Sequence, residues 1–429
     1  MEIYYVPSLF WSIMRMLLFV SYLIPFASSA LQLHPHLSNV SDEQALLEFK
    51  SAITSQSLPW KRNISFCRWK GVACSRSRQR VVSLDVSSMG LQGTVSPFLG
   101  NLSFLRILNL SNNSFHGHIP DQLGYLFRLK MLLLSQNRLH GSIPPTLSGC
   151  RSLQNILLGY NNLTGNIPAE LGVLPKLEDI SLTHNNLTGT IPASLGNISS
   201  LKWMDLCNNN LHGSVPSELG TLRQLSRLYL CENHLTGQIP SSLSNCTDLQ
   251  VLFVSFNQLT GHIPGELCRK NTILTGLYLS ANQLSGTIPA SIFNCTKLRK
   301  IDFAQNQLNG IVPMELAKLS QLELFNLGVN QLVSSRTTNL PILTALTNCS
   351  SLEEIDLNDN HLMGRLPFSI GHLSTKMNYL NLGFNALSGE IPPQIGNLTS
   401  LTVIGLHNNL FDEIYLASSN HARGKTYRL

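Results

Sequence analysis

A repeat of 24 residues dominates the sequence. The segments that show it most clearly are LRILNLSNNSFHGHIP from Leu105, LKMLLLSQNRLHGSIP from Leu129, LQNILLGYNNLTGNIP from Leu153 and LEDISLTHNNLTGTIP from Leu177. The same frame runs from a degenerate copy at Val81 to Leu401 and gives 14 copies, with one 30-residue step between Leu322 and Leu352. A period of this length indicates stacked units, none of which can bury its apolar face alone. The repeats therefore predict one elongated solenoid, although 429 residues would otherwise suggest two or three domains.

Each recurring letter of the repeat has a physical role. In L-x-x-L-x-L-x-x-N, the L-x-L alternation predicts a short strand whose leucines point into the core. The Asn that follows can bond backbone groups of its own turn and of the neighbouring copy, so stacked copies predict an asparagine ladder. Gly and Ile-Pro then bend the chain, and L-G-x-L supplies a short helical return. The expected fold is an α/β repeat solenoid, right-handed and curved, with a parallel sheet on its concave face.

A different pattern precedes the first repeat. The segment SDEQALLEFKSAI predicts an amphipathic helix that has Ser41 as its N-cap and places Ala45, Leu46, Phe49 and Ile53 on one face. Such a helix can cover the open end of the first coil.

These motifs carry a family resemblance. L-x-x-L-x-x-L-x-L-x-x-N-x-L-x-G-x-I-P, from Val81 to about Asn409, is similar to the plant extracellular leucine-rich repeat, and the segment before it resembles the N-terminal cap of plant leucine-rich repeat receptors. The cap resemblance implies a disulfide between Cys67 and Cys74. The stretch from TALTNCSSLEEIDL onward is similar to a receptor kinase subfamily that includes plant immune receptors, which implies ligand perception in defence.

The N-terminus predicts secretion. Arg15 precedes an apolar run over residues 16–26, and small residues follow as far as Ala30, which is typical of a signal peptide cleaved after Ala30. A signal anchor is the alternative, but the run is shorter than the roughly 20 residues of a membrane span. No later apolar run is long enough to cross a membrane, so we expect no transmembrane segment in the mature chain. We expect the chain to be extracellular. If a longer form has a membrane-spanning segment, we expect it at the outer surface of the plasma membrane. Twelve Asn-x-Ser/Thr sites fit this expectation as glycosylation candidates: Asn39, Asn63, Asn101, Asn109, Asn112, Asn162, Asn186, Asn197, Asn245, Asn294, Asn348 and Asn397.

The nine cysteines fall into several groups. Four occupy the return segments, where we expect buried core thiols: Cys150, Cys246, Cys295 and Cys349. Cys268 has no comparable position in the frame. Cys207 and Cys231 follow the L-x-L of adjacent strands, so they should lie side by side on the concave sheet, either bridged or as two thiols.

Composition and motifs argue against several functions. Charged residues make up 13% of the chain and the net charge is +6, without an arginine-rich run, so nucleic acid is not expected as a partner. No zinc-type Cys/His spacing occurs, and we expect His116, His140 and His212 to be solvated turn residues, so neither a metal nor a cofactor is predicted. Kinase, nucleotide-binding and serine-hydrolase signatures are also missing, so the chain is not expected to be an enzyme.

One basic cluster lies near the cap. It comprises Lys61, Arg62, Arg68, Lys70, Arg76, Arg78 and Arg80. These residues form either a solvated cap surface or a site for an acidic partner such as a cell-wall polyanion.

The outward strand positions of the middle copies predict the binding site. They combine aromatic and charged side chains, as interface hot spots do. The residues are Tyr160, His184, Trp203, Asp205, Arg227, Tyr229, Glu232, Phe253, Phe256 and Tyr278. Aromatics also suit strands without any ligand, but L-x-L already fills the core. We therefore expect a peptide or protein ligand, of microbial origin if the role is defence, and a co-receptor kinase as a further partner.

The chain divides into four predicted segments: a signal peptide (1–30), a cap (31–80), the solenoid (81–411) and an irregular tail (412–429). In the last copy Glu413 stands where the repeat has Gly, and no Ile-Pro follows. We expect the last coil to expose apolar core, as in a receptor truncated before its membrane span and kinase.

The alternative function is a secreted inhibitor, because plant polygalacturonase inhibitors are similar in repeat motif, although they resemble a shorter array with a cap at both ends.

Overall fold

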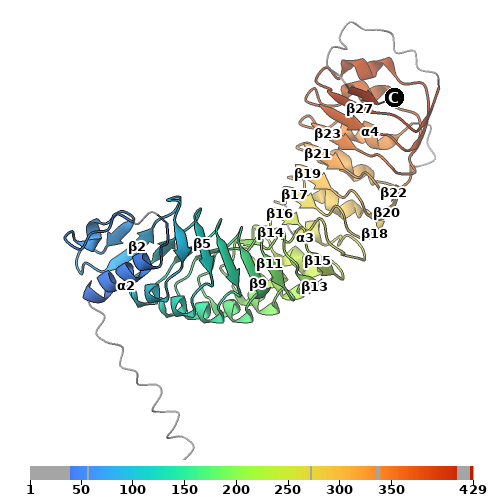
Figure 1. Cartoon of the computed structure of the whole chain (residues 1–429). Helices are drawn as coiled ribbons and strands as arrows, with labels where there is room; N and C mark the ends of the chain where they lie inside the picture. Colours follow the sequence, from blue (N-terminus) through green and yellow to red (C-terminus); the bar gives the residue numbers. More distant parts are fainter. Residues whose placement is uncertain (1–38, 56–57, 271–272, 335–338, 413–425, 429) are drawn as a thin grey trace, which may run out of the picture.

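Repeating strands build the protein into a curved solenoid. The computed structural model describes residues 39–55, 58–270, 273–334, 339–412 and 426–428, and within these ranges the solenoid bends most strongly near β16 and β17 (Figure 1). A 16-stranded sheet lines the inner side, and all its neighbours pair in parallel except β1 and β2. The predicted fold class is therefore confirmed.

The strands of this sheet are short and occur once per coil. Their order follows the chain: β1 (Val72–Cys74), β2 (Val81–Asp85), β4 (Ile107–Asn109), β6 (Met131–Leu133), β8 (Asn155–Leu157), β10 (Asp179–Ser181), β12 (Trp203–Asp205), β14 (Arg227–Tyr229), β16 (Val251–Phe253), β17 (Gly276–Tyr278), β19 (Lys300–Asp302), β21 (Leu324–Asn326), β23 (Glu354–Asp356), β25 (Tyr379–Asn381), β27 (Val403–Gly405) and β29 (Thr426–Arg428).

Smaller sheets follow the turn after each strand. They contain β3 (Gln92–Thr94), β5 (Ser114–Gly117), β7 (Arg138–Gly141), β9 (Asn162–Asn166), β11 (Asn186–Thr188), β13 (His212–Ser214), β15 (His234–Thr236), β18 (Ser285–Thr287), β20 (Gln307–Gly310), β22 (Gln331–Leu332), β24 (Met363–Gly364), β26 (Ala386–Gly389) and β28 (Leu410–Phe411). Most returns are 3₁₀ helices such as η7 (Ser217–Thr221), whereas α3 (Leu267–Lys270) and α4 (Pro341–Leu346) are α-helical returns. In the copy with the 30-residue step, α4 takes the place of the 3₁₀ return.

Leucines fill the interior along the whole solenoid. Leu228 and Leu230, the L-x-L pair of one copy, are fully buried, and equivalent residues in the other copies join them in one continuous core. Leu243, on the return of the same copy, is 1% exposed. Outward strand positions thus stay free of any core role.

An asparagine ladder ties each coil to the one before it. Asn233 Nδ2 donates to Leu206 O at 2.9 Å in the preceding coil and to Leu230 O and Cys231 O in its own. Its Oδ1 accepts from Leu211 N at 3.0 Å. The same bonds recur at every predicted ladder position: Asn113, Asn137, Asn161, Asn185, Asn209, Asn257, Asn282, Asn306, Asn330, Asn360, Asn385 and Asn409.

The N-terminal cap is a helix locked to the first coil. α2 (Asn39–Ser51) begins before Ser41, so the prediction of Ser41 as N-cap is wrong, because the helical pattern starts two residues earlier. Ala45, Leu46 and Phe49 are buried as predicted, and Ile53 lies past the helix in a bridge with Gly93. Cys67 and Cys74 form a disulfide, as the resemblance implied.

A buried ion pair joins this cap to the solenoid. Arg80 donates from Nε and Nη2 to the two carboxylate oxygens of Asp42, at 2.9 and 2.8 Å, and Val81 N donates to the same carboxylate. Arg80 is 6% exposed and Asp42 is fully buried. The interpretation of Arg80 as a solvated residue is therefore wrong, because its charge is neutralised inside the junction.

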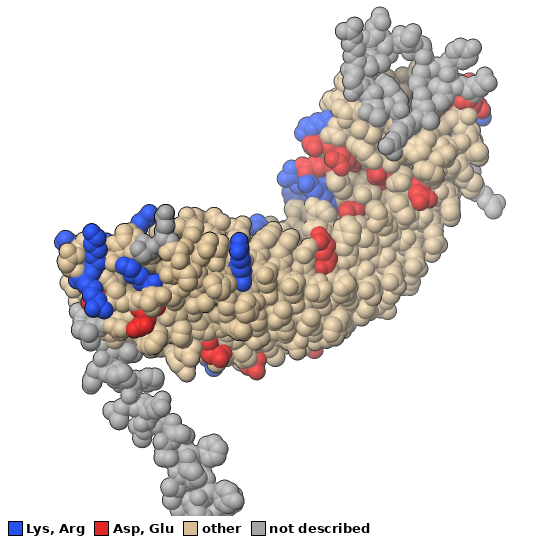
Figure 2. Space-filling model, in the orientation of Figure 1, with Lys and Arg blue, Asp and Glu red and all other residues tan. Residues whose placement is uncertain are grey.

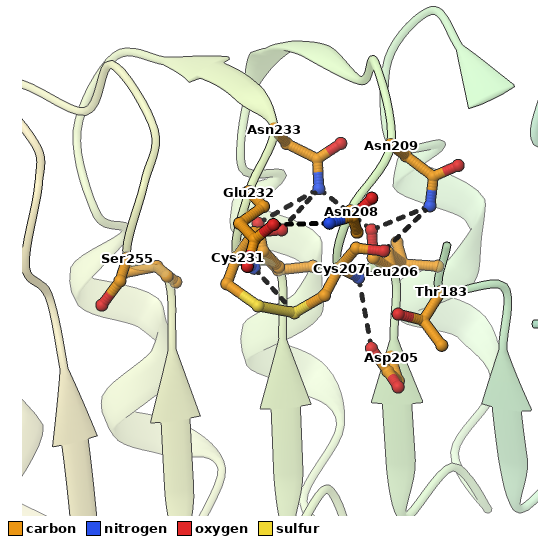
Figure 3. Close-up of a disulfide and its surroundings, with 12 residues drawn as sticks. Thr183, Asp205, Leu206, Cys207, Asn208, Asn209, Cys231, Glu232, Asn233 and Ser255 are labelled. Carbon is orange, nitrogen blue, oxygen red and sulfur yellow. Dashed lines mark hydrogen bonds between the residues drawn. A yellow bond between two sulfur atoms is a disulfide. The ribbon is translucent and has the colours of Figure 1, made fainter. Parts of the chain in front are cut away.

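Three disulfides form among the described residues. Cys207 and Cys231 are bridged across β12 and β14, with their Cα atoms 4.5 Å apart, which decides between the two alternatives left open by the sequence (Figure 3). Cys268 pairs with Cys295 at a Cα distance of 5.3 Å, so the prediction of Cys295 as a core thiol is wrong. The reason is that α3 stacks on the 3₁₀ return of the next coil and brings Cys268 alongside.

The C-terminal end also differs from expectation. Leu401, Ile404 and Leu406 are only 4–6% exposed, so the last complete coil does not expose its core as expected. β29 pairs in parallel with β27, so residues 426–428 are not irregular, because pairing satisfies backbone groups at the sheet edge. Glu413 lies outside the described residues. No helix in the described ranges has the length and apolar content that crossing a bilayer requires.

The ladder predicts a specific destabilisation. Replacing Asn233 by Ala leaves a buried N–H and several buried carbonyls without this partner, so the free energy of unfolding should fall by about 1–3 kcal/mol. Urea unfolding followed by circular dichroism measures this. The control is Asn210→Ala, an exposed asparagine of the adjacent coil, which should change stability by less than about 0.5 kcal/mol. Equal effects of the two substitutions would contradict the ladder's role.

The cysteines predict a labelling pattern. Cys150, Cys246 and Cys349 lie outside the three bridges and are buried, and burial raises the pKa of Cys150 to about 12 and those of the other two to about 11. Iodoacetamide at mildly alkaline pH should therefore label none of these three residues in the folded chain and all three after unfolding without reductant. Alkylated Cys207, Cys231, Cys268 or Cys295 in the unreduced digest would overturn the pairing.

Candidate functional site

A groove of about 670 Å³ lies on the concave face, across the middle coils. Among the residues that line it are seven of the ten predicted binding residues: Tyr160, His184, Trp203, Asp205, Tyr229, Phe253 and Tyr278. Arg227, Glu232 and Phe256 are not in the lining. Seven of the ten predicted positions therefore border one hollow, and their role in binding a ligand stays a prediction.

One row of strand positions forms an aromatic wall. Because the strands are in register, Asp205 lies beside Tyr229, Tyr229 beside Phe253, and Phe253 beside Tyr278. The Phe253 ring centre is 6.1 Å from that of Tyr229 and 5.0 Å from that of Tyr278. Burial raises the pKa of both tyrosines, so both stay protonated and can donate a hydrogen bond at neutral pH.

Small residues make the hollow next to this wall. Ser181 occupies the same row one strand before Asp205, and Gly159 lies on the turn of the coil before that. A Cβ at Gly159 would lie 2.9 Å from Thr183 Cγ2, so a larger residue there would push into the groove floor. The sequence reasoning missed these residues because it looked for large side chains, although the abrupt change from small to aromatic in one row was visible.

The other rim of the groove comes from turn residues rather than strand residues. Tyr160 and His184, which line this rim, have φ of 58° and 53°, a left-handed conformation. That conformation costs an ordinary L-residue about 1–2 kcal/mol, and Asn tolerates it best. Tyr160 nevertheless occupies it, half exposed, and stacks on His184 at 4.2 Å between ring centres.

Asp205 and Trp203 carry two polar groups of the groove with different surroundings. Asp205 accepts a hydrogen bond from Cys207 N at 3.2 Å, and burial raises its pKa despite this bond. Trp203 Nε1 is buried and finds no acceptor within the described part of the chain. Arg227 is exposed and flanks Trp203 on the next strand, outside the lining. The groove thus offers an aromatic wall, tyrosine hydroxyls that can donate, and the Asp205 carboxylate as an acceptor.

A smaller hollow of about 230 Å³ lies farther along the same face. Glu354, Asp356 and Tyr379 line it, and Asp356 accepts from Tyr379 Oη at 3.2 Å and from Asn381 Nδ2 at 3.3 Å. These contacts already satisfy the carboxylate, so the hollow is the weaker candidate.

The predicted glycosylation sites lie mostly on the surface, and two of them are close to the groove in sequence. Ten of the asparagines in the predicted glycosylation sites are exposed, and Asn109 is half-buried on β4. The side chain of Asn39 lies outside the described residues. Asn162 and Asn186 begin β9 and β11, two residues after the groove residues Tyr160 and His184.

Family comparisons agree with this architecture. Models of the leucine rich repeat match residues 175–235, 199–259 and 272–332, and others match 104–126, 128–150, 351–373 and 376–398. The leucine rich repeat N-terminal domain matches residues 39–75. All of these models describe repeats or their cap.

Among curated proteins, the chain is similar to LRR receptor-like serine/threonine-protein kinase EFR of Arabidopsis thaliana, with 49% identity over 83 residues. It is also similar to Receptor kinase-like protein Xa21 of Oryza sativa subsp. japonica, with 46% identity over 66 residues. These alignments cover 18% and 15% of this chain, but only 8% and 6% of the relatives' lengths.

Solved structures give broader coverage. The ectodomain of the Arabidopsis receptor kinase HAESA, in complex with an IDA peptide hormone lengthened at its N-terminus, has 36% identity and a TM-score of 0.75, and the match covers 87% of this chain and 62% of that one. The PEPR1–AtPEP1 complex has 30% identity and a TM-score of 0.64, over 86% of this chain and 62% of that one. The repeat and cap matches show that the chain belongs to the leucine-rich repeat family, and its likeness to solved structures is to plant receptor ectodomains.

Proposed function

We propose that the chain recognises an extended peptide outside the cell and holds it in the concave groove. The observation that carries this proposal is the aromatic wall of Tyr229, Phe253 and Tyr278 beside the hollow over Ser181. The core is complete without these rings, because the leucines of the same strands fill it. Rigid aromatic side chains around a concave surface are typical of binding hot spots.

The chemistry of the groove suits a peptide. An extended chain presents alternating N–H and C=O groups, and the groove has the Asp205 carboxylate as an acceptor and the hydroxyls of Tyr229 and Tyr278 as donors. The apolar wall can cover one or two side chains of the ligand. The HAESA and PEPR1 structures are complexes with peptides, which supports the same class of ligand here.

The comparisons support recognition of a ligand rather than catalysis as the function of this chain. The matching family models describe repeats and a cap, and the kinase-named relatives align over fewer than one hundred residues. A role in defence, a microbial source of the ligand and docking of a co-receptor kinase stay predictions from the sequence resemblance.

Peptide selection tests the proposal. A displayed library of random peptides is selected on the secreted chain, and the enriched peptides are measured against Tyr229→Ala/Phe253→Ala. Removing two hot-spot rings should weaken binding by at least about 2 kcal/mol, which is about 30-fold. The matched control, Tyr125→Ala/Phe368→Ala, removes two exposed rings outside the groove lining and should leave affinity unchanged. Equal affinity of the groove variant and the wild type would refute the assignment.

A further inference from the structure

Charge is distributed unevenly along the chain. Residues 39–151 contain 13 Lys and Arg against five Asp and Glu, a net +8, whereas residues 152–429 contain 16 against 18, a net −2. Figure 2 shows Lys and Arg side chains at the N-terminal end of the solenoid with few Asp and Glu side chains among them, whereas both kinds are mixed on the C-terminal arm. The small net charge of the whole chain therefore hides a strongly basic end, outside the concave groove.

Part of this charge forms an ordered strip across the first coils. Arg106 and Lys130 stand immediately before β4 and β6, and Lys130 N donates to Arg106 O at 2.8 Å, so the two residues are direct neighbours on adjacent coils. The Arg128 guanidinium lies 4.1 Å from the Phe104 ring centre, and that of Arg78 lies 5.7 Å from the same centre. We name these four cations, Arg78, Arg106, Arg128 and Lys130, the basic strip.

No carboxylate neutralises the basic strip within the described ranges. The ion pairs found there join Arg80 to Asp42, Lys202 to Glu178 and Arg299 to Glu323, and none includes a strip residue. Arg78, Arg106 and Lys130 are exposed. Clustered like charges repel one another, so an arrangement of this kind attracts a polyanion.

Aromatic rings lie beside these cations. Phe127 is 52% exposed and its ring centre is 5.3 Å from the Arg128 guanidinium, while Tyr125, on the same coil, is 63% exposed. An exposed aromatic ring can contact a partner with its apolar face. The C–H face of a sugar ring is such a surface, and a uronic acid adds the carboxylate that the cations require.

We propose that the basic strip, together with Phe127, binds a linear acidic polysaccharide of the polyuronate type. Successive coils repeat about every 4.8 Å, so Arg106 and Lys130, at the same position of adjacent coils, can contact neighbouring carboxylates of one polymer, with Arg78 and Arg128 around Phe104 beside them. A folded acidic protein fits less well, because a stable protein interface needs about 1,000 Å² with an apolar centre, whereas the strip is narrow and mostly charged. This surface is separate from the groove, so it can anchor the protein while the groove stays open.

Binding of unesterified polygalacturonate to the secreted full-length chain tests the proposal, with fully methyl-esterified polymer of the same length as the neutral probe. The wild type should bind the acidic polymer with an affinity that falls as the salt concentration rises, and it should not bind the methyl-esterified polymer. Arg78→Gln/Arg106→Gln/Lys130→Gln should weaken binding at least about tenfold. The control Arg223→Gln/Lys297→Gln/Lys376→Gln removes the same charge from exposed sites elsewhere and should change affinity less than about twofold.

Two results would overturn the proposal: equal binding of the ester, or equal affinities of the strip and control variants. Phe127→Ala tests the sugar contact separately and should weaken binding about threefold. Loss with the strip variant but none with Phe127→Ala would refute the role of this ring. Urea unfolding of every variant checks that the fold is unchanged.

Discussion

The hydrogen bonds of the ladder asparagines are the interaction on which the rest of the structure depends. A coil of this solenoid turns sharply after its strand and buries backbone groups that no helix or sheet can pair. The amide of each ladder asparagine bonds carbonyls of its own coil and of the preceding one, and its oxygen accepts an N–H from the preceding coil. Because a side-chain amide offers two donors and an acceptor in one plane, it can satisfy these groups at once. Each coil is thereby fixed in register with its neighbour.

Fixed register has a functional consequence. It aligns the outward strand positions into straight rows. A side chain on one coil therefore lies directly beside the side chain at the equivalent position of the next coil. In one row Ser181 and Asp205 precede Tyr229 and Phe253, and the change from small to large side chains produces a hollow with an aromatic wall. The groove is thus a property of neighbouring coils rather than of any single copy. The Cys207–Cys231 disulfide joins two of these coils at the edge of the groove and holds that wall in place.

The N-terminal end of the solenoid is covered by the cap, whereas each middle coil is covered by its neighbours. At the N-terminal end the helix α2 covers the core, and the buried pair of Asp42 and Arg80 fixes the helix to the first strand. Removing one member of such a pair leaves an unpaired buried charge, so the pair specifies how the cap docks. Beyond this junction the remaining cations face solvent, which separates a charged surface near the cap from the aromatic groove in the middle coils.

The sequence by itself determined the repeat frame, the inward leucines and the ladder, because each is set by the spacing within one copy. It also identified Tyr229 and Phe253 as outward aromatics. Only the tertiary structure decided features that depend on contacts between coils: the pairing of Cys268 with Cys295, the burial of Arg80 by Asp42, and the hollow above Ser181. Spacing along a chain fixes what a residue does within its own coil, whereas its partners in the next coil are fixed only when the coils stack.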